Sequence, residues 1–191
     1  MTIGPGTVIG IAWLVFLLVW LVSSFSAKRI AKREPGAPIL RRVVLGLVAY
    51  FLLVPSREGH LGILAAKVVP EHLSLEWSGA AMTCAGVAFA IWARIHIGKY
   101  WSATVALKAD HQLIRSGPYA RIRHPIYTGV LLAIAGSATA SDTYGGLLAI
   151  AIYAVGFWWK ARKEEALLAG EFGSAFEEHR RQTGFFLPRL F

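Results

Sequence analysis

Long apolar runs separated by polar and basic segments dominate the pattern along this chain. Two uninterrupted runs, residues 5–25 and 75–97, are long enough to cross a bilayer as helices, which takes about 20 residues. Two shorter runs, residues 125–140 and 144–161, are separated by the polar tripeptide at 141–143. We expect a helix in each run, and because the last two are joined by so short a turn, we expect them to form an antiparallel hairpin.

Another helix is expected between residues 43 and 70, where the apolar pattern is broken. The run is clean to Val54, and a second apolar stretch covers residues 61–69. Between them stand Pro55, Arg57, Glu58 and His60. A proline followed by charges fits either one kinked span or a span followed by an interfacial helix, and the sequence leaves both open. The expected fold class is therefore all-α, a polytopic membrane protein with about five transmembrane helices.

The chain divides into two parts at the end of the third expected helix. Residues 1–97 hold the first three helices, with a basic linker at 26–42, and we expect the first helix to be retained because the run lacks the basic start and cleavage pattern of a signal peptide. Residues 98–191 form the expected catalytic half. This half comprises a polar loop at 98–125, the hairpin at 125–161 and a tail at 162–191. Leu168, Phe172 and Phe176 recur every four residues in the tail, which predicts an amphipathic helix along the membrane surface.

Composition and charge support this membrane interpretation. The chain is 55 % hydrophobic with a mean hydropathy of +0.52, too apolar for a soluble domain of 191 residues. Its net charge of +9 would suggest nucleic-acid binding in a soluble protein, but no basic recognition motif accompanies the charge. Apart from Arg57 and Lys67, the lysines and arginines lie in the linker, the polar loop with its flanks, and the tail. This bias predicts an integral membrane protein with the amino terminus outside and the carboxyl terminus in the cytoplasm. The sequence carries no organelle address, which favours a bacterial inner membrane.

Two polar clusters stand at the ends of the expected hairpin. The polar loop carries His111, Arg115, Tyr119, Arg121, Arg123, His124 and Tyr127. Glu164 and Glu165 follow the last span, close to Lys160, Arg162 and Lys163. Taken alone, each group fits an ordinary structural role, such as a helix start, a lipid anchor or a solvent-exposed helix face. An antiparallel hairpin would bring the two clusters together, and the combination of histidines, tyrosines and arginines facing adjacent carboxylates favours a binding or catalytic site.

The segments HQLIRSGPYARIRHPIYTG (111–129) and KEEALLAGEFGSAFEEHRRQTGFFLP (163–188) together resemble the isoprenylcysteine carboxyl methyltransferase and phospholipid N-methyltransferase family. The resemblance covers about the carboxyl-terminal half of the chain, with Gly98, Trp101 and Ser102 as a further lead-in. It is carried by His111, Leu113, Gly117, Pro118, Tyr119, Arg123, His124, Pro125, Tyr127, Gly129, Glu164, Glu165, Phe172, Gly173, Phe176 and Pro188.

The resemblance implies an S-adenosylmethionine-dependent membrane methyltransferase whose active site faces the cytoplasm. The residues it assigns to the cofactor are His111, Gln112, Leu113, Ile114, Tyr119, His124, Pro125, Ile126, Tyr127 and Gly129. Those it assigns to catalysis and substrate orientation are Arg123, Glu164, Glu165 and Lys160. Lys160 stands where many members have arginine, and a lysine lacks the two-pronged donor that fits a carboxylate. The glycine-rich dinucleotide-binding motif of soluble Rossmann folds is absent from the sequence, which agrees with this reading.

The nature of the substrate leaves alternatives open. The expected acceptor is lipophilic and most simply a carboxylate of the prenylcysteine type, with a phospholipid amine or a thiol as alternatives. A related family of NADPH-dependent sterol and lipid reductases carries a similar R-H-P-x-Y stretch, with an Asn after the Pro and an acid after the Gly. Here those places are Ile126 and Val130, which favours methyl transfer.

A non-catalytic membrane scaffold or transporter subunit is the other class to consider, although the charges stand at the membrane boundary and not at its middle. The expected partners are membrane lipids and a lipidated or lipophilic substrate. His60, His72, His96 and His179 have no metal-ligand spacing, so no metal site is expected. The sequence predicts no oligomeric state.

Overall fold

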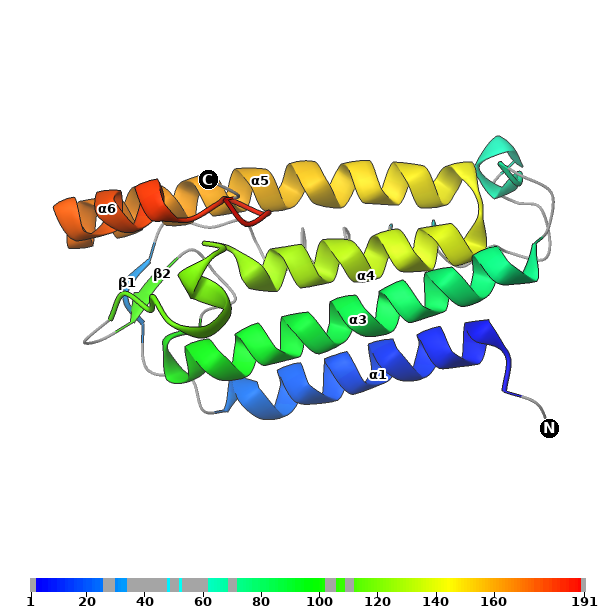
Figure 1. Cartoon of the computed structure of the whole chain (residues 1–191), viewed down its shortest axis with the longest axis horizontal. Helices are drawn as coiled ribbons and strands as arrows, with labels where there is room; N and C mark the ends of the chain where they lie inside the picture. The colour runs from blue at the N-terminus through cyan, green and yellow to red at the C-terminus, as the bar shows by residue number, and fades with distance from the viewer. Residues whose placement is uncertain are drawn as a thin grey trace. The chain divides into compact units, whose positions relative to one another are not determined.

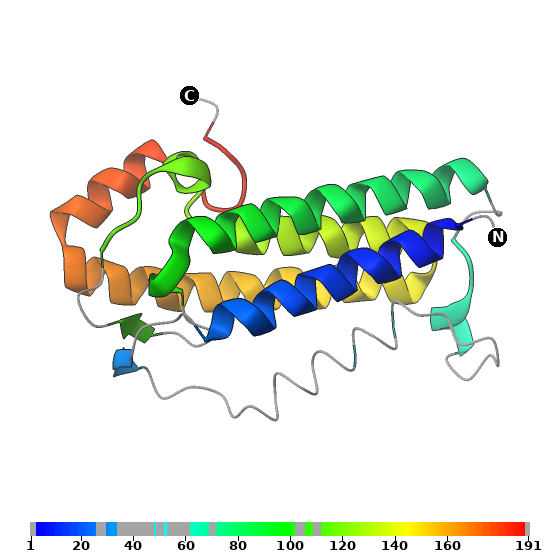
Figure 2. The same cartoon turned by 90° about the horizontal axis from the view of Figure 1, so that it is seen from below.

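The computed structural model describes residues 3–25, 30–33, 48, 52, 62–68, 72–101, 106–108 and 112–189. Its long elements are the helices α1 (Pro5–Ser24), α3 (Leu73–Ile97), α4 (Pro125–Ser141), α5 (Tyr144–Phe172) and α6 (Ser174–Gln182) (Figure 1). Single 3-10 turns occupy Gly62–Ala65, Gly98–Tyr100 and Gly117–Ala120. Strands β1 (Ile30–Arg33) and β2 (Ala106–Lys108) form an antiparallel pair (Figure 2).

Three of the expected helices are found within two residues of their expected bounds, as α1, α3 and α4. In the described part of the chain, two helices have the length and hydropathy of a membrane span, over Pro5–Ser23 and Leu73–Tyr100. The helix α4 is apolar but shorter. Of the helix expected between residues 43 and 70, the structure describes only Val48, Leu52 and residues 62–68, in which Gly62–Ala65 form a single 3-10 turn. The number of five spans therefore stays a prediction.

The last long helix extends further than the apolar pattern indicates. We expected it to end near Ala161, whereas α5 continues to Phe172. The added turns are rich in Lys, Glu, Ala and Leu, which are good helix formers, and Lys160 pairs with Glu164 one turn later.

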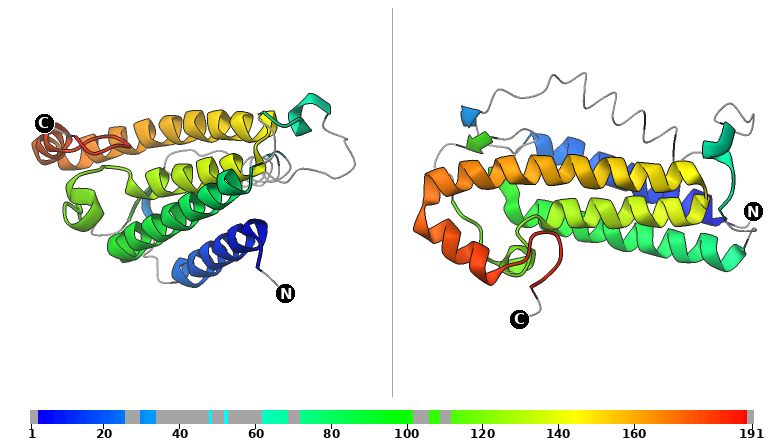
Figure 3. Two further views of the ribbon diagram at one scale, coloured as in Figure 1. Left: turned by 45° about the vertical axis from the view of Figure 1, so that its right-hand side comes forward. Right: turned by 90° about the horizontal axis from the view of Figure 1, so that it is seen from above.

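Gly173, at φ 50°, ends this helix because a residue without a Cβ adopts that backbone at little cost. A second helix, α6, follows in a new direction (Figure 3). Leu168, Phe172 and Phe176 therefore do not share one continuous helix, and Phe176 is buried inside the protein. An amphipathic tail helix on the membrane surface stays a prediction.

The chain forms two compact units, and neither is continuous in sequence. The first comprises residues 1–15, 37–87 and 130–155. In it, α3 and α4 pack closely at Gly79 and Gly136, as small residues allow in membrane helices. Hydrogen bonds among Trp13, Thr83 and Ser137 tie α1, α3 and α4 together there. Asp142, at φ 50°, makes the tight turn from α4 into α5.

The second unit comprises residues 16–36, 88–129 and 156–191 and includes both strands. Its core joins residues from α3, α4, α5 and the polar loop, namely Ala93, Tyr119, Ile126, Tyr127 and Ala161. Arg94, which is 1 % exposed, donates to the backbone carbonyls of Gly98 and Ser23 and lies over the Trp101 ring. This contact ties the end of α1 to the end of α3. All the residues of the site described next belong to this unit.

Candidate functional site

Backbone hydrogen bonds join the carboxyl-terminal tail to the segment that contains Arg123 and His124. The amide of Arg123 donates to the Gly184 carbonyl at 2.9 Å, and the amide of Gly184 donates to the Arg121 carbonyl at 3.0 Å. The His124 amide also donates to the Phe185 carbonyl. These bonds form a short parallel bridge between residues 122 and 184. The segment thereby satisfies its backbone polar groups without a helix or sheet, as a buried loop must.

A glycine-proline turn positions Tyr119. Gly117 has φ 57°, a backbone conformation that favours glycine, and an added Cβ there would also displace the His96 ring. The phenol of Tyr119 donates to the Ala93 carbonyl on α3. Burial, with a smaller effect of the nearby Glu164, raises the pKa of Tyr119, so this phenol stays protonated at neutral pH.

Glu165 is the buried partner of two basic side chains. Its carboxylate accepts from Arg123 Nε at 2.6 Å and lies 3.3 Å from His124 Nε2. Burial alone would raise the pKa of Glu165, but the hydrogen bonds from His124 and Arg123 and their charges outweigh it, so the pKa is lowered. Arg123 also donates through Nη1 to the Thr183 and Arg180 carbonyls. The guanidinium is therefore fixed by both α5 and the tail.

Glu164, the neighbouring carboxylate, has different partners. The Tyr127 hydroxyl donates to its two oxygens at 2.6 and 2.8 Å, and Lys160 Nζ lies 3.7 Å away. His124 Nδ1 stands 3.8 Å from the same carboxylate. The ring of Tyr127 is stacked between those of His124 and Phe157, at interplanar angles of 8° and 7°. Stacking fixes the phenol, and the phenol fixes the carboxylate.

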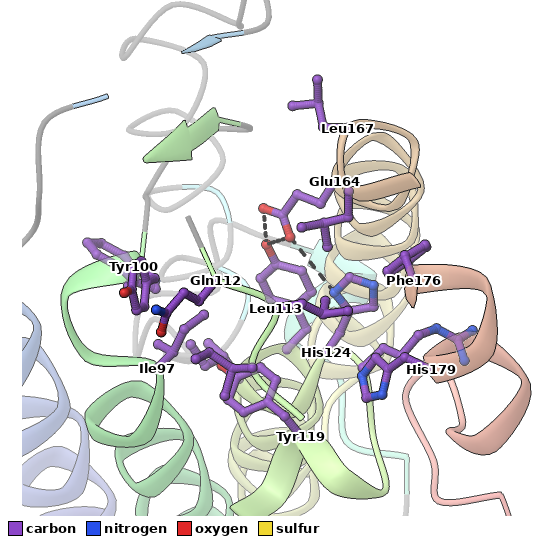
Figure 4. A pocket seen from close by; sticks show the side chains of 16 residues that line it. Ile97, Tyr100, Gln112, Leu113, Tyr119, His124, Glu164, Leu167, Phe176 and His179 are labelled. Atoms are coloured by element: carbon purple, nitrogen blue, oxygen red, sulfur yellow. Dashed lines mark hydrogen bonds and ion pairs between the residues drawn. The ribbon is translucent and has the colours of Figure 1, made fainter. Parts of the chain in front are cut away.

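These groups surround a pocket (Figure 4). Its polar side chains include Gln112, Arg123, His124, Glu164 and His179, and the rest of its wall is mostly aromatic and aliphatic. The lining residues are Ile97, Tyr100, Trp101, Gln112, Leu113, Ile114, Tyr119, Arg123, His124, Ile126, Tyr127, Glu164, Leu167, Leu168, Phe176 and His179. An apolar pocket with a few convergent polar groups is typical of a small-molecule site.

The structure brings most of the residues expected at the site into this one pocket. Those that line it are Gln112, Leu113, Ile114, Tyr119, His124, Ile126 and Tyr127 from the expected cofactor set, and Arg123 and Glu164 from the expected catalytic set. Pro125 and Gly129 are buried but do not line it. Glu165 and Lys160 stand behind the lining and contact the residues that form it. His111 lies outside the described residues.

Sequence reasoning missed several lining residues. Ile97, Tyr100 and Leu167 carry no signal that separates them from ordinary helix residues. His179 has no metal-ligand spacing and no motif of its own in the sequence, yet it lines the pocket from α6. In the part of the chain that the structure describes, no group of three or more His, Cys, Asp or Glu residues could hold a metal ion.

The fold and the pocket thus define a helical protein with two helices of membrane-spanning length among its described residues and an apolar pocket with a few convergent polar groups. Residues 79–170 match the model of the isoprenylcysteine carboxyl methyltransferase (ICMT) family. The matched region, just under half of the chain, includes α4 and most of α3 and α5.

Three curated proteins are similar in sequence. The nickel-cobalt-cadmium resistance protein NccN of Alcaligenes xylosoxydans xylosoxydans is 32 % identical over 117 residues, which cover 60 % of this chain and 53 % of that protein. The cobalt-zinc-cadmium resistance protein CzcN of Cupriavidus metallidurans is 31 % identical over 147 residues, 75 % of this chain and 62 % of that protein. The protein-S-isoprenylcysteine O-methyltransferase of Schizosaccharomyces pombe is 27 % identical over 119 residues, 59 % of this chain and 49 % of that protein.

A solved structure of the eukaryotic intramembrane Ras methyltransferase ICMT has a similar fold. The TM-score is 0.54 at 20 % sequence identity, over 80 % of this chain and 53 % of that one. The matched part of this chain thus spans about half to three-fifths of the length of these relatives.

Proposed function

We propose that this chain is a membrane-embedded methyltransferase that uses S-adenosylmethionine and methylates a lipophilic acceptor, a carboxylate of the prenylcysteine type. The observation that carries the proposal is the convergence of Arg123, His124, Tyr127 and Glu164 in one apolar pocket. The family match of residues 79–170 favours methyl transfer over the reductase alternative.

The pocket has the chemistry to hold this cofactor. S-adenosylmethionine carries a sulfonium and an ammonium, a carboxylate and a neutral nucleoside. The carboxylate of Glu164 and the aromatic rings of Tyr119 and Trp101 suit its cationic groups, since aromatic rings attract cations. Lys160 already places its ammonium 5.0 Å from the centre of the Tyr127 ring, so a cation is tolerated at this point. Leu113, Ile114 and Leu168 offer apolar surface to a heterocycle.

The reaction asks mainly for positioning. When bound, S-adenosylmethionine supplies an activated methyl group. A carboxylate acceptor is already a nucleophile, so the protein has only to desolvate it and hold it in line with that methyl group, and such positioning is a large source of rate. Arg123 lines the pocket with its guanidinium fixed, and Lys160 offers a second cation beside Glu164. An amine or thiol acceptor would need a base in addition, for which His124 and Glu164 are the candidates.

Incubation of the full chain in membranes with methyl-labelled cofactor tests the proposal. The acceptors offered are prenylcysteine analogues, phospholipid amines and lipophilic thiols, and the labelled product is identified by mass. We expect label on the prenylcysteine carboxylate. The Glu164→Gln variant should no longer transfer the label. The matched variant Glu171→Gln, at an exposed position on the same helix, should transfer it as the unmodified chain does. Saturable binding of NADPH without binding of S-adenosylmethionine would refute the proposal in favour of a reductase.

We also propose that the pocket opens to the cytoplasm of a bacterial cell, with the amino terminus outside. The basic bias of the linker, loop and tail supports this orientation. Single cysteines at exposed positions 121 and 171, in a background with Cys84→Ser, should react with a membrane-impermeant maleimide only in inverted vesicles, and a cysteine at position 72 only in right-side-out vesicles. Reaction of positions 121 and 171 from opposite sides would contradict a shared pocket.

A further inference from the structure

One pocket wall carries a buried histidine that the proposed reaction does not use. His179, on α6, lines the pocket and is 4 % exposed (Figure 4). Its backbone carbonyl accepts from the Thr183 hydroxyl, which fixes the end of α6. Within the part of the chain that the structure describes, no hydrogen bond joins a ring nitrogen of His179 to another protein group, and the imidazole lines the pocket. A ring nitrogen that borders a pocket and makes no bond to the protein is available to hydrogen-bond a ligand there.

The surroundings of His179 favour its neutral form. Burial lowers the pKa of this imidazole, and the positive charges of Arg115 and Arg123 lower it further. Glu178 and Glu165 pair with these two arginines rather than with the ring. A neutral imidazole presents one donor and one acceptor, which suits a neutral partner with hydroxyl or ring-nitrogen groups. The adjacent arginines disfavour a cationic ligand group at this point.

The other end of the pocket has the opposite character. Glu164 enters it from α5 as a carboxylate among aromatic rings. Phe176, one turn before His179 on α6, is 2 % exposed and also lines the pocket, so it adds an apolar surface next to the imidazole. The two ends of the pocket therefore suit different ligand groups. The Glu164 carboxylate suits a positively charged group, and the wall formed by His179 and Phe176 suits an uncharged heterocycle.

We propose that His179 is a cofactor-binding residue that hydrogen-bonds the uncharged nucleoside half of S-adenosylmethionine, while Glu164 faces its cationic half. This inference rests on the proposed function, because it divides the same pocket between the two halves of that cofactor. It adds α6 to the cofactor site, whereas the sequence motif assigns only the loop and the start of α4.

Calorimetric titration of the purified full chain with two ligands tests the two halves of the pocket separately. S-adenosylhomocysteine has both the nucleoside and the charged amino-acid end, whereas 5′-methylthioadenosine has the nucleoside and no charge. His179→Ala should weaken both by the same factor, about 3- to 10-fold, which is the range for one hydrogen bond. His179→Asn keeps a hydrogen-bond donor and an acceptor, so its affinity for both ligands should fall less than that of His179→Ala. Glu164→Gln should weaken S-adenosylhomocysteine alone, and the exposed-site control His72→Ala should bind both like the unmodified chain.

Several outcomes would overturn the assignment. If His179→Ala binds both ligands as the unmodified chain does, or loses affinity only for S-adenosylhomocysteine, His179 does not contact the nucleoside. Should the alanine variant fail to fold, as judged by its thermal midpoint, the same comparison is made with His179→Phe, which keeps a ring and has no hydrogen-bonding group, and binding equal to that of the unmodified chain again refutes the assignment. An unmodified chain that binds neither ligand refutes the proposed function itself, a result distinct from failure of the His179 variants alone.

Discussion

Two carboxylates adjacent in the chain have different surroundings because a helix turns by about 100° between neighbours. Glu165 is 6 % exposed and contacts Arg123 and His124. Glu164 reaches the pocket, where the Tyr127 hydroxyl holds it. His124 lies between them, with one ring nitrogen toward each. We therefore assign Glu165 to positioning Arg123 and His124, and Glu164 to contact with the ligand.

The hydrogen bonds from Tyr127 to Glu164 should matter more for binding than for stability. Tyr127→Phe removes the hydroxyl and keeps the ring between His124 and Phe157. Because a hydrogen bond to a charged group contributes about 1.5–3 kcal/mol, we expect the affinity for S-adenosylhomocysteine to fall about tenfold or more. Calorimetric titration measures this. Tyr144→Phe, at an exposed ring on α5, is the control, and an unchanged affinity in Tyr127→Phe would show that the carboxylate does not need the phenol.

Glu165 should make the stability of the protein sensitive to acid. Its pKa is lower in the folded protein than its ordinary value of 4.5, so the unfolded chain takes up the proton first as the pH falls. The stabilisation is complete above about pH 4.5 and is lost as the pH drops through the folded pKa. The thermal midpoint of the unmodified chain in detergent should therefore fall steeply below that pH.

The matching variant is Glu165→Gln. Removing one partner of a buried ion pair typically costs about 3–5 kcal/mol, so this variant should have a lower midpoint at pH 7. It should also show a flatter dependence on pH below 4.5 than the unmodified chain. Parallel curves for the two proteins would mean that Glu165 does not contribute this acid sensitivity.

At the scale of the elements, backbone contact between α3 and α4 organises the first unit. An ideal Cβ at Gly79 would lie 2.5 Å from the Gly136 carbonyl oxygen, and one at Gly136 would lie 2.6 Å from the Gly79 carbonyl oxygen. Thr83 and Ser137 hydrogen-bond across the same contact. Helices in lipid gain little from burying apolar side chains, so close packing and such hydrogen bonds hold them together. The small residues therefore set the distance between α3 and α4.

A single methyl group should disrupt this contact. Gly136→Ala places a Cβ against the backbone of α3, where nothing flexible can move aside, so we expect a lower thermal midpoint in detergent and reduced yield of folded protein. Gly156→Ala on α5 is the control, because its Cβ would meet nothing within 4 Å. Alanine is the better helix former by about 1 kcal/mol, so the control should be as stable as the unmodified chain or more so. Equal midpoints for the two variants would refute the close contact.

At the scale of the whole molecule, the second unit assembles its pocket from segments far apart in the chain. The loop supplies Tyr119 and Arg123, α5 supplies Glu164, and α6 supplies His179. Gly184 and Phe185 in the tail hydrogen-bond to the backbone of Arg121, Arg123 and His124. Phe185 and Phe186 pack against the His124 ring at centroid distances of 5.1 and 6.2 Å. The tail is therefore a part of the site.

Shortening the chain after Gln182 tests this role of the tail. The change removes the Thr183, Gly184 and Phe185 carbonyls that bond to Arg123 and His124 and leaves α4, α5 and α6 complete. We expect a loss of S-adenosylhomocysteine binding of tenfold or more in calorimetric titration, with the helical content in circular dichroism nearly unchanged. Shortening after Pro188, beyond the residues that make these bonds, is the control and should bind normally. Full affinity in the shorter variant would refute a structural role of the tail in the site.

Local pattern was enough to locate most helices and the two polar clusters. Apolar runs, a proline at the first turn of α4 and the polar tripeptide at 141–143 predict α1, α3, α4 and the start of α5, because each signal acts over neighbouring residues. The motif around Arg123 and Glu164 likewise predicts a shared site. The end of α5 was wrong by about three turns, since an apolar pattern marks the membrane and not the end of a helix that continues into water.

Only the tertiary structure decided which of these residues line the pocket and which stand behind it. Glu164 and Glu165 look equivalent in the sequence, and their roles separate because Tyr127 and Arg123 approach α5 on different faces. His179 carries no motif of its own, and it gains its place because Gly173 redirects the chain and the tail returns to residues 121–124. Local patterns follow from the chemistry of each segment, whereas these contacts join segments about 40 to 60 residues apart, and such pairings have no periodic signal in the sequence.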